Sequence, residues 1–224
     1  MYLIAKRHLS YIIIILVVVC IHLIEVNLID PHTTAMIGTD FAHVVQQIEG
    51  DAVLWFSQHW TPVLVYFLVL MYIAVYPFTL WFSLLYFLVT DEKKSMKTLA
   101  YGLMLIYAIA LPFYLFVPIN NVYMYYNIDS ALEAAIPTVE RFFYSMTTQN
   151  NCLPSLHVAM TILIAWSVRL TGNKKFSYFA YFCMISVILS VIYLAIHWIL
   201  DVVCGILLAT AVIAILHHFM KGEQ

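Results

Sequence analysis

Long apolar runs separated by short polar segments dominate the pattern along the chain. They cover about residues 9–24, 62–90, 98–117, 155–170 and 176–216. A helix that crosses a membrane needs about 20 apolar residues, so each of the first four runs predicts one span. The last run, of about 41 residues, would reach about 61 Å as one helix, twice the hydrocarbon thickness of about 30 Å. It must turn back, and its polar interruption at Tyr193–Asp201 predicts a fifth span that ends before His197 and a sixth that starts near it.

The segment between the first two apolar runs is mixed in character. Residues 25–61 hold five acidic residues and no lysine or arginine. Residues 42–60 carry apolar side chains in a broken amphipathic pattern that includes Trp55 and Trp60. Amphipathic segments with tryptophans are at home in the membrane interface. The pattern therefore predicts an all-α fold with six transmembrane helices in one bundle, and an interfacial helix after the first span.

Composition supports a polytopic membrane protein. Hydrophobic residues make up 64% of the 224 residues, charged residues only 10%, and the mean hydropathy is +0.94. An ordinary soluble domain has about a quarter charged residues, so that class is excluded. A net charge of −2 gives no indication of nucleic-acid binding. We expect residues 1–224 to form a single integral membrane domain, with its chemical motifs in a core of about residues 98–218.

The distribution of basic residues predicts the orientation in the membrane. Lys6 and Arg7 precede an apolar run that could be a signal peptide, but the segment after it, Glu25–Pro31, has no small-residue cleavage site. The run is therefore interpreted as an uncleaved first span. Six spans leave only Arg141 on one side and put nine basic residues on the other: Lys6, Arg7, Lys93, Lys94, Lys97, Arg169, Lys174, Lys175 and Lys221. The positive-inside rule then places both termini in the cytoplasm and the segments around His157 and His197 at the extracytoplasmic face.

His197 and Asp201 form the first candidate site. Residues four apart lie on one helical face, so Asp201 can accept a proton from His197 Nδ1. This leaves Nε2 as a free base or nucleophile, with a carboxylate that fixes the tautomer and stabilises positive charge on the ring. Ionisable residues inside apolar runs are costly and usually functional.

A second candidate site lies at the mouth of the run that starts near residue 155, which reads Asn151-Cys-Leu-Pro154-Ser155-Leu156-His157. Pro154 suits the first position of a helix. The backbone N–H groups of Ser155, Leu156 and His157 would then lie at a helix N-terminus, which is a natural anion site. Two histidines beside an anion site suggest phosphoryl transfer. Further donors expected near the phosphate are Arg141, Asn150, Asn151 and Tyr193.

At these residues the sequence resembles the type-2 phosphatidic acid phosphatase superfamily of integral membrane enzymes. Pro154-Ser155-Leu156-His157 is similar to its central signature, Pro-Ser-x-His, and Ser190, His197, Asp201 and Gly205 have the spacing of its C-terminal signature. The resemblance implies that His197 is the nucleophile that forms a phosphohistidine, that Asp201 orients it, and that His157 protonates the leaving oxygen. It implies no metal and no other cofactor.

Two departures favour the branch of the superfamily that transfers head groups. Its hydrolases usually carry arginine directly after the serine matched by Ser190, where this chain has Val191, and their Lys-x6-Arg-Pro signature is missing. Inositol phosphorylceramide synthases and sphingomyelin synthases also lack that arginine, and the chain looks closer to them. A singly charged phosphodiester needs fewer cationic donors than a phosphate monoester. We therefore expect transfer of a phosphorylated head group from a membrane lipid to a hydroxyl acceptor, with the lipid bilayer as surroundings.

Other functions remain open at this point. A lipid phosphate or isoprenyl diphosphate phosphatase is about as compatible with the motifs. His157, His197 and Asp201 could instead hold zinc, although no Cys-x-x-Cys or His-Glu-x-x-His pattern supports a zinc site. An ion or proton-coupled transporter would place its ionisable residues at several depths, whereas these cluster at one depth. The other histidines, His22, His43, His217 and His218, are interpreted as structural.

Overall fold

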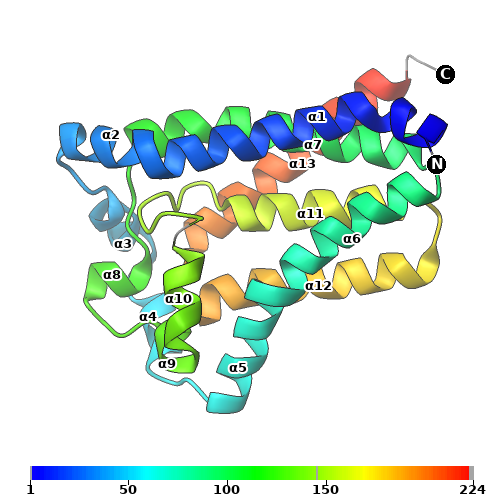
Figure 1. Cartoon of the computed structure of the whole chain (residues 1–224). Coiled ribbons are helices and arrows are strands. Elements are labelled where there is room, and N and C mark those ends of the chain that lie inside the picture. Colours follow the sequence, from blue (N-terminus) through cyan, green and yellow to red (C-terminus); the bar gives the residue numbers. More distant parts are fainter. Residues whose placement is uncertain (1, 145, 222–224) are drawn as a thin grey trace.

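The computed structural model describes residues 2–144 and 146–221, and the regular elements of this part are helices (Figure 1). The N-terminal half contains α1 (Tyr2–Ile24), the π-helical turn η1 (Glu25–Ile29), α2 (Asp30–Ile37), α3 (Ala42–Glu49), α4 (Ala52–Ser57), α5 (Pro62–Leu70), the π-helical turn η2 (Met71–Val75), α6 (Tyr76–Val89) and α7 (Lys93–Phe116). The C-terminal half contains α8 (Val122–Tyr126), α9 (Ala131–Ala135), α10 (Pro137–Phe143), α11 (Leu156–Arg169), α12 (Lys174–Tyr193) and α13 (Ile199–Lys221).

Five helical segments are long and apolar enough to cross a membrane. They are Lys6–Ile37, Pro62–Val89, Lys93–Phe116, Lys174–Tyr193 and Ile199–Met220. The remaining predicted span, the fourth at about residues 155–170, corresponds to α11, which is apolar but has only 14 residues, or about 21 Å of helix. The prediction of an all-helical membrane protein is confirmed, whereas the count of six spans stays a prediction.

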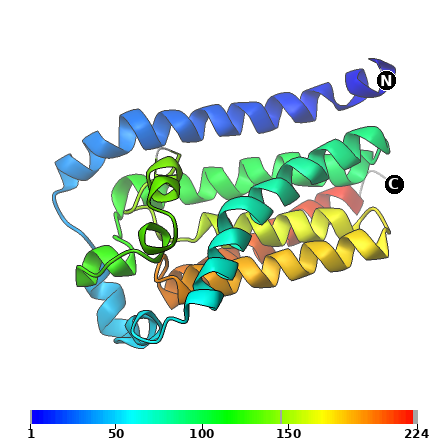
Figure 2. The same cartoon turned by 60° about the horizontal axis from the view of Figure 1, so that its bottom comes forward.

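The short helix α11 lies at the centre of the bundle. Its contacts with α7, α12 and α13 bury Val158, Leu163 and Ile164 almost completely. At Gly102 of α7, an added Cβ would lie only 2.5 Å from Leu163 Cδ1, so the glycine allows the two helices to approach closely. Figure 2 shows α11 and α12 side by side, with α1 along one edge of the bundle.

Two prolines explain why the first two long segments contain π-helical turns. Proline lacks an N–H and its ring clashes with the carbonyl four residues earlier, so the preceding turn of an α-helix cannot close normally. Turn η1 ends two residues before Pro31, and turn η2 ends two residues before Pro77. The first helix therefore continues through Glu25 and Asp30 to Ile37, beyond the predicted end near residue 24. Such π-turns occur frequently at functional sites.

The reversal between α12 and α13 confirms the predicted break near His197. Helix α12 ends at Tyr193 and α13 begins at Ile199. Ala195 adopts a φ of 56° in the turn, which is uncommon for a residue other than glycine. This explains why the local sequence gives only a weak signal for the turn.

The predicted interfacial helix is two short helices in the structure. Helices α3 and α4 are separated at Gly50, whose φ of 64° interrupts the helix. Glu49 Oε2 accepts a hydrogen bond from the backbone N–H of Ile199 at 2.9 Å, which attaches α3 to the start of α13. Their position in the membrane interface stays a prediction.

The arrangement of the helix ends fits the predicted orientation. The start of α1, the end of α13, the α6–α7 turn and the α11–α12 turn lie together at one end of the bundle (Figure 1). These segments carry the nine basic residues counted above, whereas Arg141 belongs to α10 at the opposite end. Which end faces the cytoplasm is a prediction from that charge bias.

Labelling with an impermeant thiol reagent tests this orientation. We expect Asp129→Cys to react from outside intact cells and Lys93→Cys to react only after the cells are permeabilised. Both positions are exposed and lie in or beside turns at opposite ends of the bundle. The wild-type chain, with its native cysteines Cys20, Cys152, Cys183 and Cys204, gives the background signal. The reverse labelling pattern would place the two histidines on the cytoplasmic side.

Candidate functional site

His157 lies in the first turn of α11. Ser155 is the N-cap of this helix, because its Oγ accepts from the backbone N–H of Val158 at 3.5 Å. Pro154 therefore precedes the cap, so the prediction that it occupies the first helical position is wrong. The backbone N–H of Ser155 donates to the carbonyl of Asp201 at 3.0 Å, which leaves Leu156 and His157 at the open start of the helix.

A close approach of α13 fixes the start of α11. An added Cβ at Gly205 would lie 2.6 Å from the carbonyl oxygen of Ser155 and 3.2 Å from Val158 Cβ. Because backbone cannot yield as a side-chain tip does, a residue larger than glycine would push the two helices apart. Gly205 thereby allows α11, which carries His157, to pack closely against α13, which carries Asp201.

His197 and Asp201 interact as the spacing predicts. His197 Nδ1 lies 3.3 Å from Asp201 Oδ2, and the same oxygen accepts from the backbone N–H of Trp198 at 2.9 Å. His197 precedes α13, so the carboxylate reaches back over the start of its helix, as the acidic residue of a capping box does. The backbone N–H of His197 donates to Val191 O at 2.9 Å, so both ends of the histidine are fixed.

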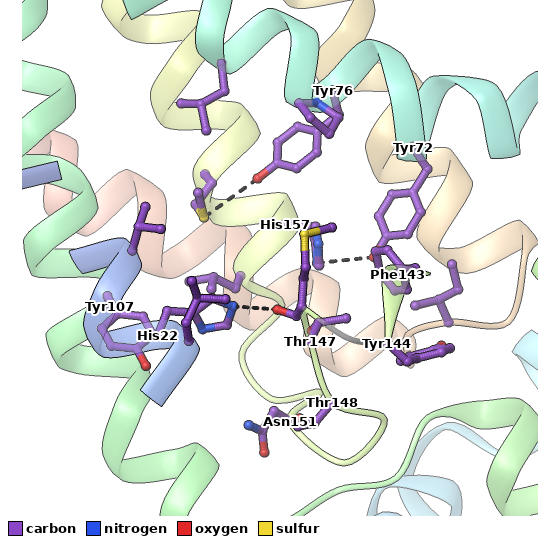
Figure 3. Close-up of a pocket in the computed structure, with 18 of the residues that line it drawn as sticks. His22, Tyr72, Tyr76, Tyr107, Phe143, Tyr144, Thr147, Thr148, Asn151 and His157 are labelled. Atoms are coloured by element: carbon purple, nitrogen blue, oxygen red, sulfur yellow. Dashed lines mark hydrogen bonds between the residues drawn. The ribbon is translucent and has the colours of Figure 1, made fainter. Parts of the chain in front are cut away.

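The two histidine rings lie beside each other near the start of α11, tilted by 56°. Their centroids are 6.4 Å apart, too far for a hydrogen bond between the rings but close enough for one phosphoryl group to bridge them. His157 Nδ1 lies 3.2 Å from the hydroxyl of Tyr72, and the rings of Tyr76 and Phe143 pack around it (Figure 3). A phenol oxygen can accept a proton from Nδ1, and this arrangement leaves Nε2 free to take up and release a proton.

Both histidines line one cavity of about 330 Å³. Its polar part consists of aromatic hydroxyls, threonines, Asn121 and Asn151 beside the histidines, and the rest of its wall is apolar. Figure 3 shows His22 and Tyr107 on one side of this space, with Tyr72, Phe143 and His157 on the other. Among the residues that the structure describes, no lysine or arginine lines it.

The residues predicted to bind phosphate fall into two groups. Leu156 and Asn151 line the cavity. Ser155 is fully buried and has its hydroxyl and N–H engaged in the cap described above. Arg141 is exposed on α10 and does not line the cavity, and the hydroxyl of Tyr193 accepts from the backbone N–H of Thr61 at 2.9 Å, away from the cavity. The arrangement therefore gives no support to the predicted phosphate contacts of the Ser155, Arg141 and Tyr193 side chains.

The sequence did not indicate several residues that the fold brings to the site. Tyr72 comes from η2, and Glu25 comes from η1, where it accepts from Asn151 at 2.8 Å and from Tyr107 at 3.3 Å. His22, interpreted as structural, lines the cavity and donates to the carbonyl oxygen of Met146 at 3.1 Å. The available signal for His22 and Glu25 was a histidine and an acidic residue close together at the end of an apolar run and before Pro31.

One group of side chains in the described part has the donor set of a metal site. Cys152, His197 and Asp201 have their ligand atoms within 4.8 Å of one another, whereas His157 is not part of this group. Burial raises the pKa of the Cys152 thiol well above its usual value, and the neighbouring carboxylate of Asp201 raises it further. Zinc bound at these atoms would itself deprotonate the thiol. Zinc binding by this group therefore stays an alternative, which the effect of a chelator on activity tests.

A family model matches most of the chain. The family model described as the PAP2 superfamily matches residues 39–215, which include His157, His197 and Asp201 but not α1. No curated protein and no solved structure matches the chain.

Proposed function

Because the chain belongs to the PAP2 superfamily, we propose that it is an integral membrane lipid phosphotransferase that uses His197 as its nucleophile and acts at the extracytoplasmic face. The observation that carries the proposal is the pair of neighbouring histidines, one bonded to Asp201 and the other to Tyr72, in a cavity whose wall is mostly apolar. Such a cavity suits a phosphate attached to a hydrocarbon chain.

The residues divide the reaction into two steps. In the first, Nε2 of His197 attacks phosphorus and the bond to the leaving oxygen breaks, while the imidazolium of His157 donates its Nε2 proton to that oxygen and becomes a neutral imidazole that keeps its proton on Nδ1, toward Tyr72. The carboxylate of Asp201 stabilises the charge that arises on the His197 ring. In the second step, His157 accepts the proton of an acceptor hydroxyl, whose oxygen attacks phosphorus and releases His197.

The charge of the cavity supports a phosphodiester as the group transferred. A phosphate monoester has nearly two negative charges at neutral pH, and a site for it gathers cationic donors. Val191, where the hydrolases have arginine, is fully buried in the core and offers only its carbonyl, which accepts from Ile196 and His197. With no lysine or arginine among the described cavity residues, a singly charged phosphodiester is the better match.

Product analysis tests the proposal. Purified protein in detergent would be incubated with lipid phosphodiesters, lipid monophosphates and isoprenyl diphosphates, each labelled in the phosphate, with and without a lipid hydroxyl acceptor. We expect the label to move from a phosphodiester to the acceptor lipid, with slow hydrolysis when no acceptor is present. The activity should persist in a chelator.

The same assay identifies the opposing outcomes. Rapid release of inorganic phosphate from a monophosphate or diphosphate, without transfer to any acceptor, would show a phosphatase instead. Activity that is lost in a chelator and restored by zinc would contradict the phosphohistidine mechanism.

A further inference from the structure

Helix α1 turns one face toward the catalytic cavity, and this face changes from apolar to polar along the helix. Ile15, Val18, Val19 and His22 all line the cavity, and their spacing of three, four and seven residues places them on one side of a helix. From Ile15 to His22 this face extends over about 10 Å. Val17, which does not line the cavity, is 49% exposed on the outer side.

The polar end of this face is hydrogen-bonded to residues 146–151, the segment before Pro154. Glu25, one turn beyond His22, is fully buried and accepts from Asn151 at 2.8 Å, while His22 donates to Met146 O at 3.1 Å. Both partners lie in the segment that leads to Pro154 and His157. The polar end of this face is therefore attached to the segment that leads to His157, and Figure 3 shows His22 on the other side of the cavity from His157.

Helix α6 forms another part of the cavity wall. Pro77, Leu80 and Trp81 line the same cavity, and Trp81 is 55% exposed. On α1, Val19 is 36% exposed. Since both walls include residues of the outer apolar surface, the apolar part of the cavity reaches the surface that faces lipid, while its inner end holds the buried His197.

We propose that the hydrocarbon chain of the substrate lipid lies between α1 and α6, and that the face at Ile15, Val18 and Val19 selects the chain next to the phosphate. This inference rests on the proposed function. The occupant is argued from the lining of this cavity, which includes both the exposed apolar residues Val19 and Trp81 and the two histidines. Membership of the superfamily does not imply this wall, because α1 lies outside the matched residues 39–215.

Paired substitutions on α1 test the proposal in the full-length protein. Val18→Phe narrows the cleft, and Val17→Phe makes the same change one residue away on the outer face. Two phosphodiester substrates with the same head group would be compared, one with a long chain and one with a chain of a few carbons. We expect Val18→Phe to lower kcat/KM for the long-chain substrate at least about ten-fold, the discrimination typical of a filled apolar pocket. It should leave the short-chain substrate within about two-fold of wild type, and Val17→Phe should change neither value by more than that.

A photolabelling experiment keeps the proposal testable without turnover. A single-chain phosphodiester with a diazirine in its chain should label residues 15–22 in the wild type and Val17→Phe, and label them much less in Val18→Phe. Equal effects of both substitutions, or no change in the ratio of long-chain to short-chain activity, would overturn the cleft while leaving the proposed function intact. If the wild type turns over neither substrate, the proposed function fails, and labelling of α1 still decides whether a lipid chain occupies the cleft.

Discussion

Replacing His197 with alanine is expected to abolish turnover completely. The substitution removes the ring that is bonded to the carboxylate of Asp201 and lies beside His157. His157 cannot replace it, because its Nδ1 is engaged with Tyr72 and its proposed role needs a proton on Nε2. Loss of a nucleophile in a comparable triad costs about 10⁶-fold in kcat, so we expect activity below the detection limit.

Rapid quenching identifies the intermediate. Wild-type protein mixed with phosphate-labelled substrate should give protein-bound label that survives alkali and is lost in acid, as expected for a phosphorus–nitrogen bond. His197→Ala should give none. His43→Ala is the matched control, since His43 is exposed on α3 and its ring bonds only to the local carbonyl of Asp40 among the described contacts. Label retained in His197→Ala, or mapped to His157, would show that another residue is the nucleophile.

The spans of the fold were predictable because a membrane imposes their length and their apolar character. Residues 62–90 became the continuous segment Pro62–Val89, and the long final run divides between Tyr193 and Ile199, close to the predicted position. The extension of the first helix to Ile37 was not predicted, because the acidic residues Glu25 and Asp30 were interpreted as the end of the apolar run. Their cost is offset by hydrogen bonds from Asn151 and Asn150, which are more than 100 residues away in the sequence.

The candidate site was predictable only where its residues are close in sequence. The spacing of four residues was enough to place His197 beside Asp201, and the two signatures indicated that His157 lies near them. Tyr72 reaches His157 because η2 shifts the register of its helix, which depends on how Pro77 is accommodated. The local sequence pattern also could not predict where the side chain of Tyr193 points. In the structure its hydroxyl accepts a hydrogen bond from the backbone N–H of Thr61.

Asp201→Asn is expected to preserve the fold and to reduce kcat by about 10²- to 10⁴-fold, the upper value being that of the equivalent change in a serine protease. Oδ2 accepts from His197 Nδ1 and from the backbone N–H of Trp198, while Oδ1 has no partner among the described contacts. The asparagine oxygen can keep both hydrogen bonds, with its amide group at the position of Oδ1. What is lost is the negative charge that stabilises positive charge on the His197 ring as it attacks. The effect should therefore appear in kcat and in the single-turnover rate of label transfer to the protein, with little change in KM.

Glu49→Gln is the matched control for Asp201→Asn, because it makes the same acid-to-amide change next to the start of α13. Glu49 accepts from the backbone N–H of Ile199, and burial raises its pKa, so the protonated form is already favoured relative to a solvent-exposed glutamate. The glutamine oxygen can keep that hydrogen bond, and we expect kcat within about three-fold of wild type because Glu49 does not contact either histidine ring in the described contacts. Thermal unfolding of both variants should match wild type within a few degrees. If Asp201→Asn retains more than a tenth of wild-type kcat, or if Glu49→Gln loses as much activity, the carboxylate of Asp201 has no specific role in activating His197.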